Sequence, residues 1–164
     1  CLREKYSDIV DLENDGRIMI LPLGGSILKY WVNYQYLNKI NCKEVHIYDN
    51  DVKQYQQSID KINQRADGSW GVLTKKYEIE NYLNSKAIKQ IYNVDINTEE
   101  PDLPNRFAQA YFEKNKKGAP WTASQAKKRL SKVFTDAMTC DFLEEIDPDG
   151  EVKGWFDRIT QVLH

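Results

Sequence analysis

Two pairs of carboxylates in this sequence have the spacing of a divalent-metal site. Asp49 and Asp51 come directly after an apolar, β-prone run. Glu78 and Glu80 come soon after a second such run. Side chains alternate along an extended chain, so residues two positions apart face the same side. The spacing predicts that both pairs meet at one edge of a sheet, where four crowded carboxylates require Mg²⁺ or Mn²⁺ to offset their repulsion.

Each acidic pair also has a purely structural interpretation. Asp51 would then cap the N-terminus of the following helix, and Asp49 would be a solvated loop residue. Glu78 and Glu80 would lie in the first turn of a helix, where the macrodipole favours acidic side chains. In a helix their directions diverge by about 200°, so they could hardly share an ion. The residues alone leave these interpretations open.

A lysine on a later helix is the cation best placed to join such a site. Apolar residues recur at helical spacing over 122–138, and at about 100° per residue Lys127 lies at the edge of their stripe. Lys128 points away from the stripe and is the second choice. A lysine at the edge could reach a phosphate and stabilise developing negative charge. The structural alternative is a lysine that snorkels at the rim of the core.

The elements that must position these residues alternate between strand and helix. Apolar runs predict strands at 17–21, 45–49 and 70–74. The residue patterns of the segments between them predict helices at 27–40 and 52–65. This alternation with short connections is typical of a doubly wound, mostly parallel sheet, whose ligands lie beyond the carboxyl ends of the strands. His46 alternates with its neighbours inside the second strand, which indicates a packed side chain rather than a ligand.

The second half of the sequence is predicted to be mainly helical. The expected helices lie at 87–92, 105–114, 122–138 and 151–163. The acidic and proline-containing stretch 97–104 is the only linker-like segment. We therefore expect a core over residues 1–97 and a helical C-terminal extension over residues 98–164 that packs on it. The first residues have the spacing of an amphipathic helix already under way, so we also expect further chain upstream.

Composition limits the class of protein. The chain has 164 residues, of which 29% are charged and 41% apolar, as in ordinary soluble domains. No apolar run approaches the roughly 20 residues that span a bilayer, and nothing resembles a signal peptide. Three cysteines without a C-x-x-C spacing favour a reduced, cytoplasmic setting. The net charge of −2 neither indicates nor excludes nucleic acid, because a local basic patch can supply phosphate contacts.

Three motifs in this order resemble a TOPRIM domain. They are I-L-P-L-G-G-S at 20–26, I-Y-D-N-D at 47–51 and K-Y-E-I-E-N-Y-L at 76–83. More narrowly, the chain is similar to the nuclease half of OLD-family (overcoming lysogenisation defect) ATP-dependent endonucleases, including those of bacterial anti-phage and retron systems. The resemblance implies an α/β fold with a TOPRIM-like (Rossmann-like), mostly parallel sheet flanked by helices.

The same resemblance implies an endonuclease that cleaves DNA with two Mg²⁺ or Mn²⁺ ions. One ion would activate a water molecule and the other would stabilise the leaving oxygen. By motif, the metal ligands and catalytic residues would be Asp49, Asp51, Glu78 and Glu80, and Lys127 would lie near the scissile phosphate. ATP would act only through an upstream ATPase domain of the same protein. The implied partners are DNA, further copies of the chain and, in retron systems, a complex of reverse transcriptase with RNA and DNA. No interaction with a membrane is implied.

The chain departs from the TOPRIM pattern in two places. Asn50 stands in the middle of D-x-D, where such proteins often carry arginine. The essential Glu-Gly strand of these domains is not found before Ile18, and neither Glu4 nor Glu13 replaces it, so we expect it upstream. A catalytically inactive TOPRIM scaffold for oligomer assembly is therefore one alternative. Another is a Mg²⁺-binding, receiver-like regulatory module, which phosphoryl transfer to Asp49 from a small phosphodonor would favour.

Overall fold

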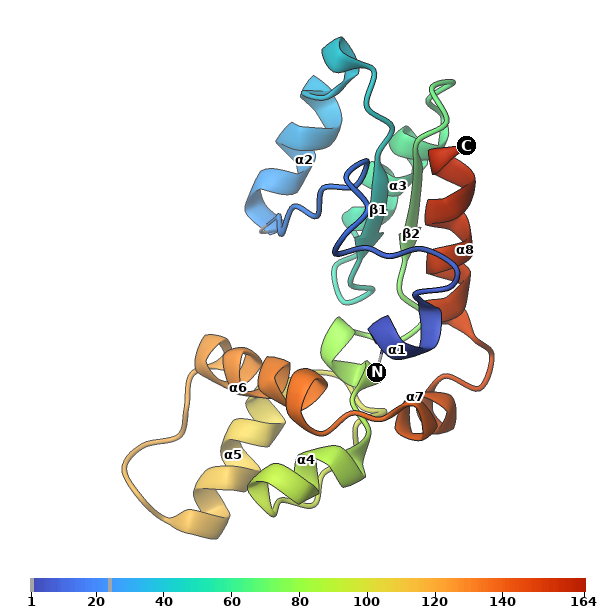
Figure 1. The fold of residues 1–164 in the computed structure, drawn as a ribbon. Helices are drawn as coiled ribbons and strands as arrows, with labels where there is room; N and C mark the ends of the chain where they lie inside the picture. The colour runs from blue at the N-terminus through green and yellow to red at the C-terminus, as the bar shows by residue number, and fades with distance from the viewer. Residues whose placement is uncertain (1, 24) are drawn as a thin grey trace. The chain divides into compact units, whose positions relative to one another are not determined.

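A computed structural model describes residues 2–23 and 25–164 of the chain (Figure 1). The fold is mixed α/β, with helices and a parallel sheet. It divides into two compact units, each described here by itself. Unit 1 consists of the residues up to Lys5 together with Lys76–Gly150, and unit 2 consists of Tyr6–Lys75 and Glu151–His164. The functional boundary expected at residue 97 stays a prediction.

Unit 2 is built on a parallel pair of strands, β1 (Val45–Tyr48) and β2 (Trp70–Leu73). The helix α3 (Tyr55–Asn63) connects them. The register sets Val45 opposite Trp70 and Tyr48 opposite Leu73. This confirms the two strands predicted here, their parallel pairing and the helix between them. The strand–helix–strand motif is therefore readable from local pattern and from the short connections.

Three further helices complete unit 2. They are α2 (Gly25–Tyr34), the 3₁₀ helix η1 (Asn38–Ile40) and α8 (Glu151–Leu163). α8 runs beside β2, and the N-terminal segment of the unit contacts it (Figure 1). The Tyr6 and Phe156 rings lie 5.0 Å apart, and the Thr160 hydroxyl donates to the Ile9 carbonyl at 3.2 Å. The chain beyond residue 150 thus returns to the sheet, and α8 confirms the helix predicted at 151–163.

The helix predicted at 27–40 is shorter than expected. Gln35 has a φ of 47°, a left-handed conformation that ends α2 after Tyr34. The helix buries the face that carries Val32, which is 3% exposed, whereas Ile27 and Tyr34 are exposed. α2 begins at Gly25, so Ser26, the last residue of the I-L-P-L-G-G-S motif, lies inside it. Gly24 lies outside the described residues.

The strand predicted at 17–21 is wrong. Met19 is 79% and Ile20 65% exposed, and the segment is not part of the sheet, which has two strands within the described residues. A local turn explains the difference, because the Asp15 carboxylate accepts the Arg17 amide at 3.0 Å and the Asp15 carbonyl accepts the Ile18 amide at 2.9 Å. An apolar run becomes a strand only where a neighbouring strand satisfies its backbone.

Unit 1 is helical around a separate core. Its elements are α1 (Leu2–Tyr6), η2 (Ile79–Tyr82), α4 (Ser85–Tyr92), α5 (Leu103–Asn115), α6 (Ala123–Asp136) and α7 (Cys140–Ile146). The last residue of α1, Tyr6, belongs to unit 2. The core side chains with no exposed surface are Leu83, Ala87, Ile88, Leu103, Phe107, Ala126, Leu130 and Val133. The helices predicted at 87–92 and 105–114 are confirmed.

The segment predicted as one helix over 122–138 ends slightly earlier and is followed by a second helix. Thr122 caps α6, because its hydroxyl accepts the Gln125 amide at 3.3 Å while the Gln125 side chain accepts the Thr122 amide at 3.0 Å. Thr139 caps α7 by accepting the Phe142 amide at 3.2 Å. Among the described residues, every helix is too short or too polar to cross a bilayer.

Candidate functional site

The acidic pair of unit 1 lies where the chain changes from extended to helical. Glu78 immediately precedes η2 and is extended, with φ −136° and ψ 161°. Glu80 is in the first turn of η2. The two carboxylates therefore follow neither the alternation of a strand nor the wheel of a continuous α-helix. Both are nevertheless buried, at 6% and 7% exposure.

Lys127 of α6 brings the two carboxylates together. Its Nζ lies 2.8 Å from Oε2 of Glu78 and 3.5 Å from Oε2 of Glu80. The lysine side chain is 42% exposed, so it extends from solvent into a pair of buried acids. Lys128 is exposed, whereas Ala126 has no exposed surface. The structure thus places Lys127, at the edge of the apolar stripe as the helical wheel predicts, beside Glu78 and Glu80.

Glu78, Glu80 and Lys127 form a cluster that we call the acidic corner, and Asn81 holds it in place. Its side-chain oxygen accepts the Glu78 amide at 2.8 Å. Its side-chain nitrogen donates to the carbonyls of Thr98 at 2.6 Å and Glu100 at 2.9 Å. Asn81 is 1% exposed, so three backbone groups depend on one buried amide. The sequence analysis missed this residue, although an asparagine directly after the Glu-x-Glu motif at the start of a helical segment is a capping signal.

The other predicted acidic pair belongs to unit 2. β1 ends at Tyr48, and Asp49 follows it half-buried. Asp51 lies in a turn and is exposed, so the alternation expected to put it on the same side as Asp49 does not extend to it. The capping interpretation of Asp51 is also wrong, because α3 begins only at Tyr55. The structure describes this pair and the pair of unit 1 separately.

The donor atoms of the acidic corner fit a divalent ion that is held by only a few protein ligands. Within the described residues, no group of three or more His, Cys, Asp or Glu side chains is placed to hold a metal. Mg²⁺ commonly binds through one or two carboxylates, keeps several waters and takes further oxygens from substrate phosphates. Glu78 and Glu80 supply two carboxylates, and the Lys127 ammonium marks the position between them as one that attracts positive charge.

A second group of titratable side chains, which we call the Glu44 network, is buried in unit 2. The Glu44 carboxylate accepts hydrogen bonds from His46 Nε2 at 2.7 Å, Arg65 at 2.9 Å and the Trp31 indole at 3.1 Å. His46 Nδ1 and the Tyr48 hydroxyl form a further hydrogen bond. The His46 ring thus connects the Glu44 carboxylate with the Tyr48 hydroxyl. The network thus joins α2, β1 with the residue before it, and Arg65 in the segment that follows α3.

The Glu44 network is charged despite its burial. Burial raises the pKa of Glu44, but the hydrogen bond from His46 and the positive charge of Arg65 outweigh it and lower the pKa overall. Burial raises the pKa of the Tyr48 hydroxyl, and the negative charge of Glu44 raises it further. Glu44 is therefore a carboxylate at neutral pH and holds its partners by charge-assisted hydrogen bonds.

The packed state predicted for His46 is confirmed, because its side chain is only 6% exposed. The sequence analysis missed the rest of the network. Glu44, immediately before β1, alternates with His46 and Tyr48 of the strand, so period-two spacing could have grouped them on one face. Arg65 and Trp31 carry no such local signal, because they meet Glu44 only through the packing of α2 and α3.

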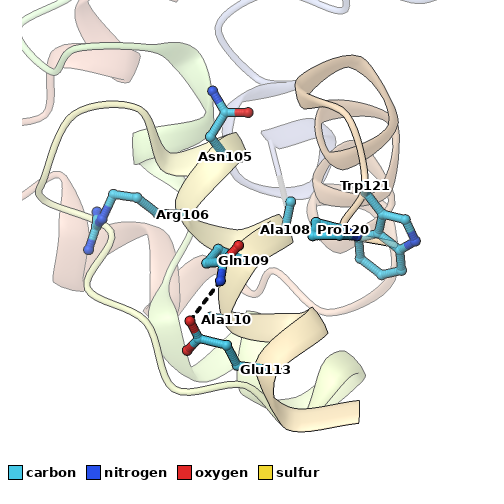
Figure 2. Close-up of a pocket in the computed structure, with 8 residues that line it drawn as sticks. All are labelled: Asn105, Arg106, Ala108, Gln109, Ala110, Glu113, Pro120 and Trp121. Atoms are coloured by element: carbon cyan, nitrogen blue, oxygen red, sulfur yellow. Dashed lines mark hydrogen bonds between the residues drawn. The ribbon is translucent and has the colours of Figure 1, made fainter. Parts of the chain in front are cut away.

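A hollow of unit 1 is separate from the acidic corner. It has a volume of about 520 Å³ and lies along α5, with Pro120 and Trp121 at one end (Figure 2). Gln109 donates to Glu113 across its floor at 2.8 Å. The Trp121 ring is stacked on Tyr111 at 4.1 Å and contacted by the Arg129 guanidinium at 4.0 Å, so it anchors the segment between α5 and α6. None of the predicted site residues lines this hollow.

Comparisons of the chain with models of known protein families, with curated proteins and with solved structures gave no match.

Proposed function

We propose that this chain is a TOPRIM-like, metal-dependent nuclease domain that cleaves DNA phosphodiester bonds. The observation that carries the proposal is the convergence of Glu78 and Glu80 on Lys127, with contacts of 2.8 and 3.5 Å. Buried carboxylates beside a half-exposed lysine combine cation ligands with a group that can neutralise a phosphate. The motif order that resembles OLD-family nucleases supports the same assignment.

The residues of the acidic corner would divide the chemistry between them. Glu78 and Glu80 would hold a divalent ion, whereas Asp49 and Asp51 of unit 2 are metal ligands only by the resemblance. Bound there, a divalent ion would supply an activated water and charge stabilisation at the leaving oxygen. Lys127 is exposed enough to turn from the carboxylates towards a bound phosphate, where its charge would stabilise the transition state. Asn81 would position Glu78 through its hydrogen bond to the backbone.

The wider assignment follows from the resemblance. The chain would be part of a larger, cytoplasmic ATPase–nuclease in anti-phage defence, with ATP bound by an upstream domain. DNA is the proposed substrate. Further copies of the chain and, in a retron system, a complex of reverse transcriptase with RNA and DNA are the proposed partners.

The direct test is nicking of supercoiled plasmid in Mg²⁺ or Mn²⁺ by the full-length protein. Glu78→Gln and Asp49→Ala should each lower the rate at least about hundredfold, because each removes a metal ligand. Glu99→Gln is the matched control, since Glu99 is 60% exposed and its partner is Lys76. Undiminished nicking by Glu78→Gln or Asp49→Ala, with circular dichroism unchanged, would overturn the proposal.

A catalytically inactive scaffold is the second candidate function. The observation in its favour is that Lys127 neutralises Glu78 directly, so the corner is stable without a metal ion. A scaffold predicts that sedimentation of the full-length protein shows an oligomer, and that Glu78→Gln changes its stability without changing any metal-dependent cleavage. Metal-dependent nicking that Glu78→Gln abolishes would reject the scaffold.

A further inference from the structure

The stretch of sequence between Asp15 and Glu44 contains no acidic residue. It carries Arg17, Lys29, Lys39 and Lys43, although the whole chain has a net charge of −2. Arg17 is paired with Asp15 at 2.7 Å, whereas Lys29 and Lys39 are exposed on and after α2. The segment between these two acids is therefore positively charged, and a polyanion would find no repelling carboxylate on it.

The same segment exposes aromatic rings. Tyr30, Tyr34 and Tyr36, which we call the tyrosine face, are 47%, 66% and 54% exposed. The Tyr30 and Tyr34 rings, one helical turn apart, are nearly parallel, with an angle of 6° and centroids 6.4 Å apart. Tyr36 continues the row at 5.8 Å from Tyr34. Three adjacent tyrosines that are each at least 47% exposed are not part of a core.

The tyrosine face has a fixed base. The Trp31 ring lies 5.4 Å from Tyr36, and its indole nitrogen donates to the buried Glu44 carboxylate at 3.1 Å. Val32, on the opposite side of α2, is 3% exposed. The Glu44 network therefore anchors the buried side of α2, while the tyrosine rings face solvent. Because the helix is already held in place, less conformational entropy is lost when a ligand binds.

Cationic side chains flank the tyrosine face. The Lys29 ammonium lies 5.0 Å from the centre of the Tyr30 ring. On α3, Lys61 donates to the Asn33 side chain at 2.8 Å. These two helices enclose a hollow of about 220 Å³, and no acidic residue lines it; the lining residues are Val32, Asn33, Gln35, Lys61, Gln64 and Arg65. Basic groups beside stacked rings match the alternation of phosphate and base along a nucleic-acid strand.

We propose that the tyrosine face binds single-stranded DNA. Unpaired bases stack on the rings of Tyr30, Tyr34 and Tyr36, and the backbone phosphates lie against Lys29 and Lys61. A duplex is excluded because its bases already stack on each other and offer no free ring face. The stacking requires neither metal nor cleavage. Only the choice of DNA over RNA rests on the proposed function.

The test is fluorescence anisotropy of the 164-residue chain with a labelled oligothymidylate of about 12 nucleotides, in EDTA so that no metal-dependent cleavage occurs. Tyr30→Ala/Tyr34→Ala should weaken binding about tenfold or more, since these rings account for two stacked bases. Both side chains are exposed, so the variant keeps its fold. Tyr77→Ala is the matched control, because Tyr77 is 46% exposed in unit 1 and should leave the affinity unchanged.

Salt dependence separates the phosphate contacts from the stacking. Lys29→Gln/Lys61→Gln should reduce the slope of log affinity against log salt by about 1.4, as expected for two lost phosphate contacts on a single strand. Lys153→Gln is the matched control, since Lys153 is exposed and its partner is Asp157. The tyrosine variant should keep the wild-type slope, because it removes stacking but no charge.

Several results would overturn the proposal. One is equal affinity of the wild type and Tyr30→Ala/Tyr34→Ala, and another is tighter binding of a duplex of the same length. A dimer in sedimentation that the tyrosine variant dissociates, without any change in oligonucleotide affinity, would assign the face to a second copy of the chain. Much tighter binding of oligouridylate would overturn the choice of DNA. Absence of plasmid nicking with intact binding would reject only the proposed nuclease function.

Discussion

The ammonium of Lys127 lies 2.8 Å from the carboxylate of Glu78, so a half-exposed base reaches an acid that is almost fully buried. The lysine thereby balances a charge that burial alone would make costly. A divalent cation bound by the same carboxylate would have to share or displace this contact. Metal binding and the ion pair are therefore coupled, and the coupling can be measured without any substrate.

Lys127→Gln should strengthen metal binding while it removes cleavage. Loss of a positive charge about 3 Å from the ligands favours a cation by about tenfold, even with the screening of bulk water. Cleavage should fall because the variant cannot stabilise the phosphate. Isothermal titration of Mn²⁺ into the substrate-free protein measures the first effect and plasmid nicking the second. Lys128→Gln, on the exposed side of α6, should change neither. Weaker Mn²⁺ binding by Lys127→Gln would contradict this account.

Asn81→Ala should destabilise unit 1 by about 3 kcal/mol, because one buried amide serves three backbone groups. Urea unfolding followed by circular dichroism measures the change. Asn97→Ala is the control, since Asn97 is an exposed asparagine of the same region whose side chain contacts Glu99 and Glu100. Its cost should stay within about 0.5 kcal/mol. Equal costs for the two variants would show that Asn81 does not hold the acidic corner.

The strand–helix–strand motif of unit 2 was predictable because its information is local. β1 and β2 are short apolar runs, and the helix between them is the usual crossover connection of parallel strands. The position of Lys127 followed in the same way from the period of α6. In each case, neighbouring residues in the sequence define the face, so no distant contact is needed to interpret it.

The acidic corner and the Glu44 network were only partly predictable, because they depend on conformation and on distant contacts. Glu78 and Glu80 converge because the chain turns helical between them, and that switch depends on the Asn81 side chain binding residues 98 and 100. Arg65 meets Glu44 only once α3 is packed on the sheet. The segment 17–21 failed as a strand for the converse reason, since its composition was right but no partner strand pairs with it in the described structure.

Gly71→Ala should destabilise unit 2 by about 1 to 2 kcal/mol. A methyl group at this position of β2 would lie 2.8 Å from Cδ1 of Ile59, which is buried and has little room to move. Thermal unfolding measures the loss, and the double variant Gly71→Ala/Ile59→Val should recover part of it by removing the clashing methyl. Gly154→Ala is the control in α8, where nothing lies within 4 Å of the new methyl.

The control Gly154→Ala and the variant Gly71→Ala should change the stability of the protein in opposite directions. Alanine is the better helix former, so Gly154→Ala should stabilise the protein by up to about 1 kcal/mol. Two results would contradict the packing described for the sheet and α3. One is that Gly154→Ala destabilises the protein, and the other is that Gly71→Ala/Ile59→Val is no more stable than Gly71→Ala alone.

Glu44→Gln should remove a stabilisation that depends on pH. The lowered pKa of Glu44 means that the folded state favours the carboxylate, so its contribution is complete above the ordinary carboxyl pKa, near 4.5, and is lost as the pH falls through the folded value. The variant should lose about 2 to 3 kcal/mol at neutral pH, because the His46 and Arg65 contacts lose their charge assistance. Urea unfolding between neutral and acidic pH should show the gap between variant and wild type closing on acidification. Asp60→Asn, exposed on α3, should stay within about 0.5 kcal/mol of the wild type, and a gap for Glu44→Gln that widens in acid would contradict a charged Glu44.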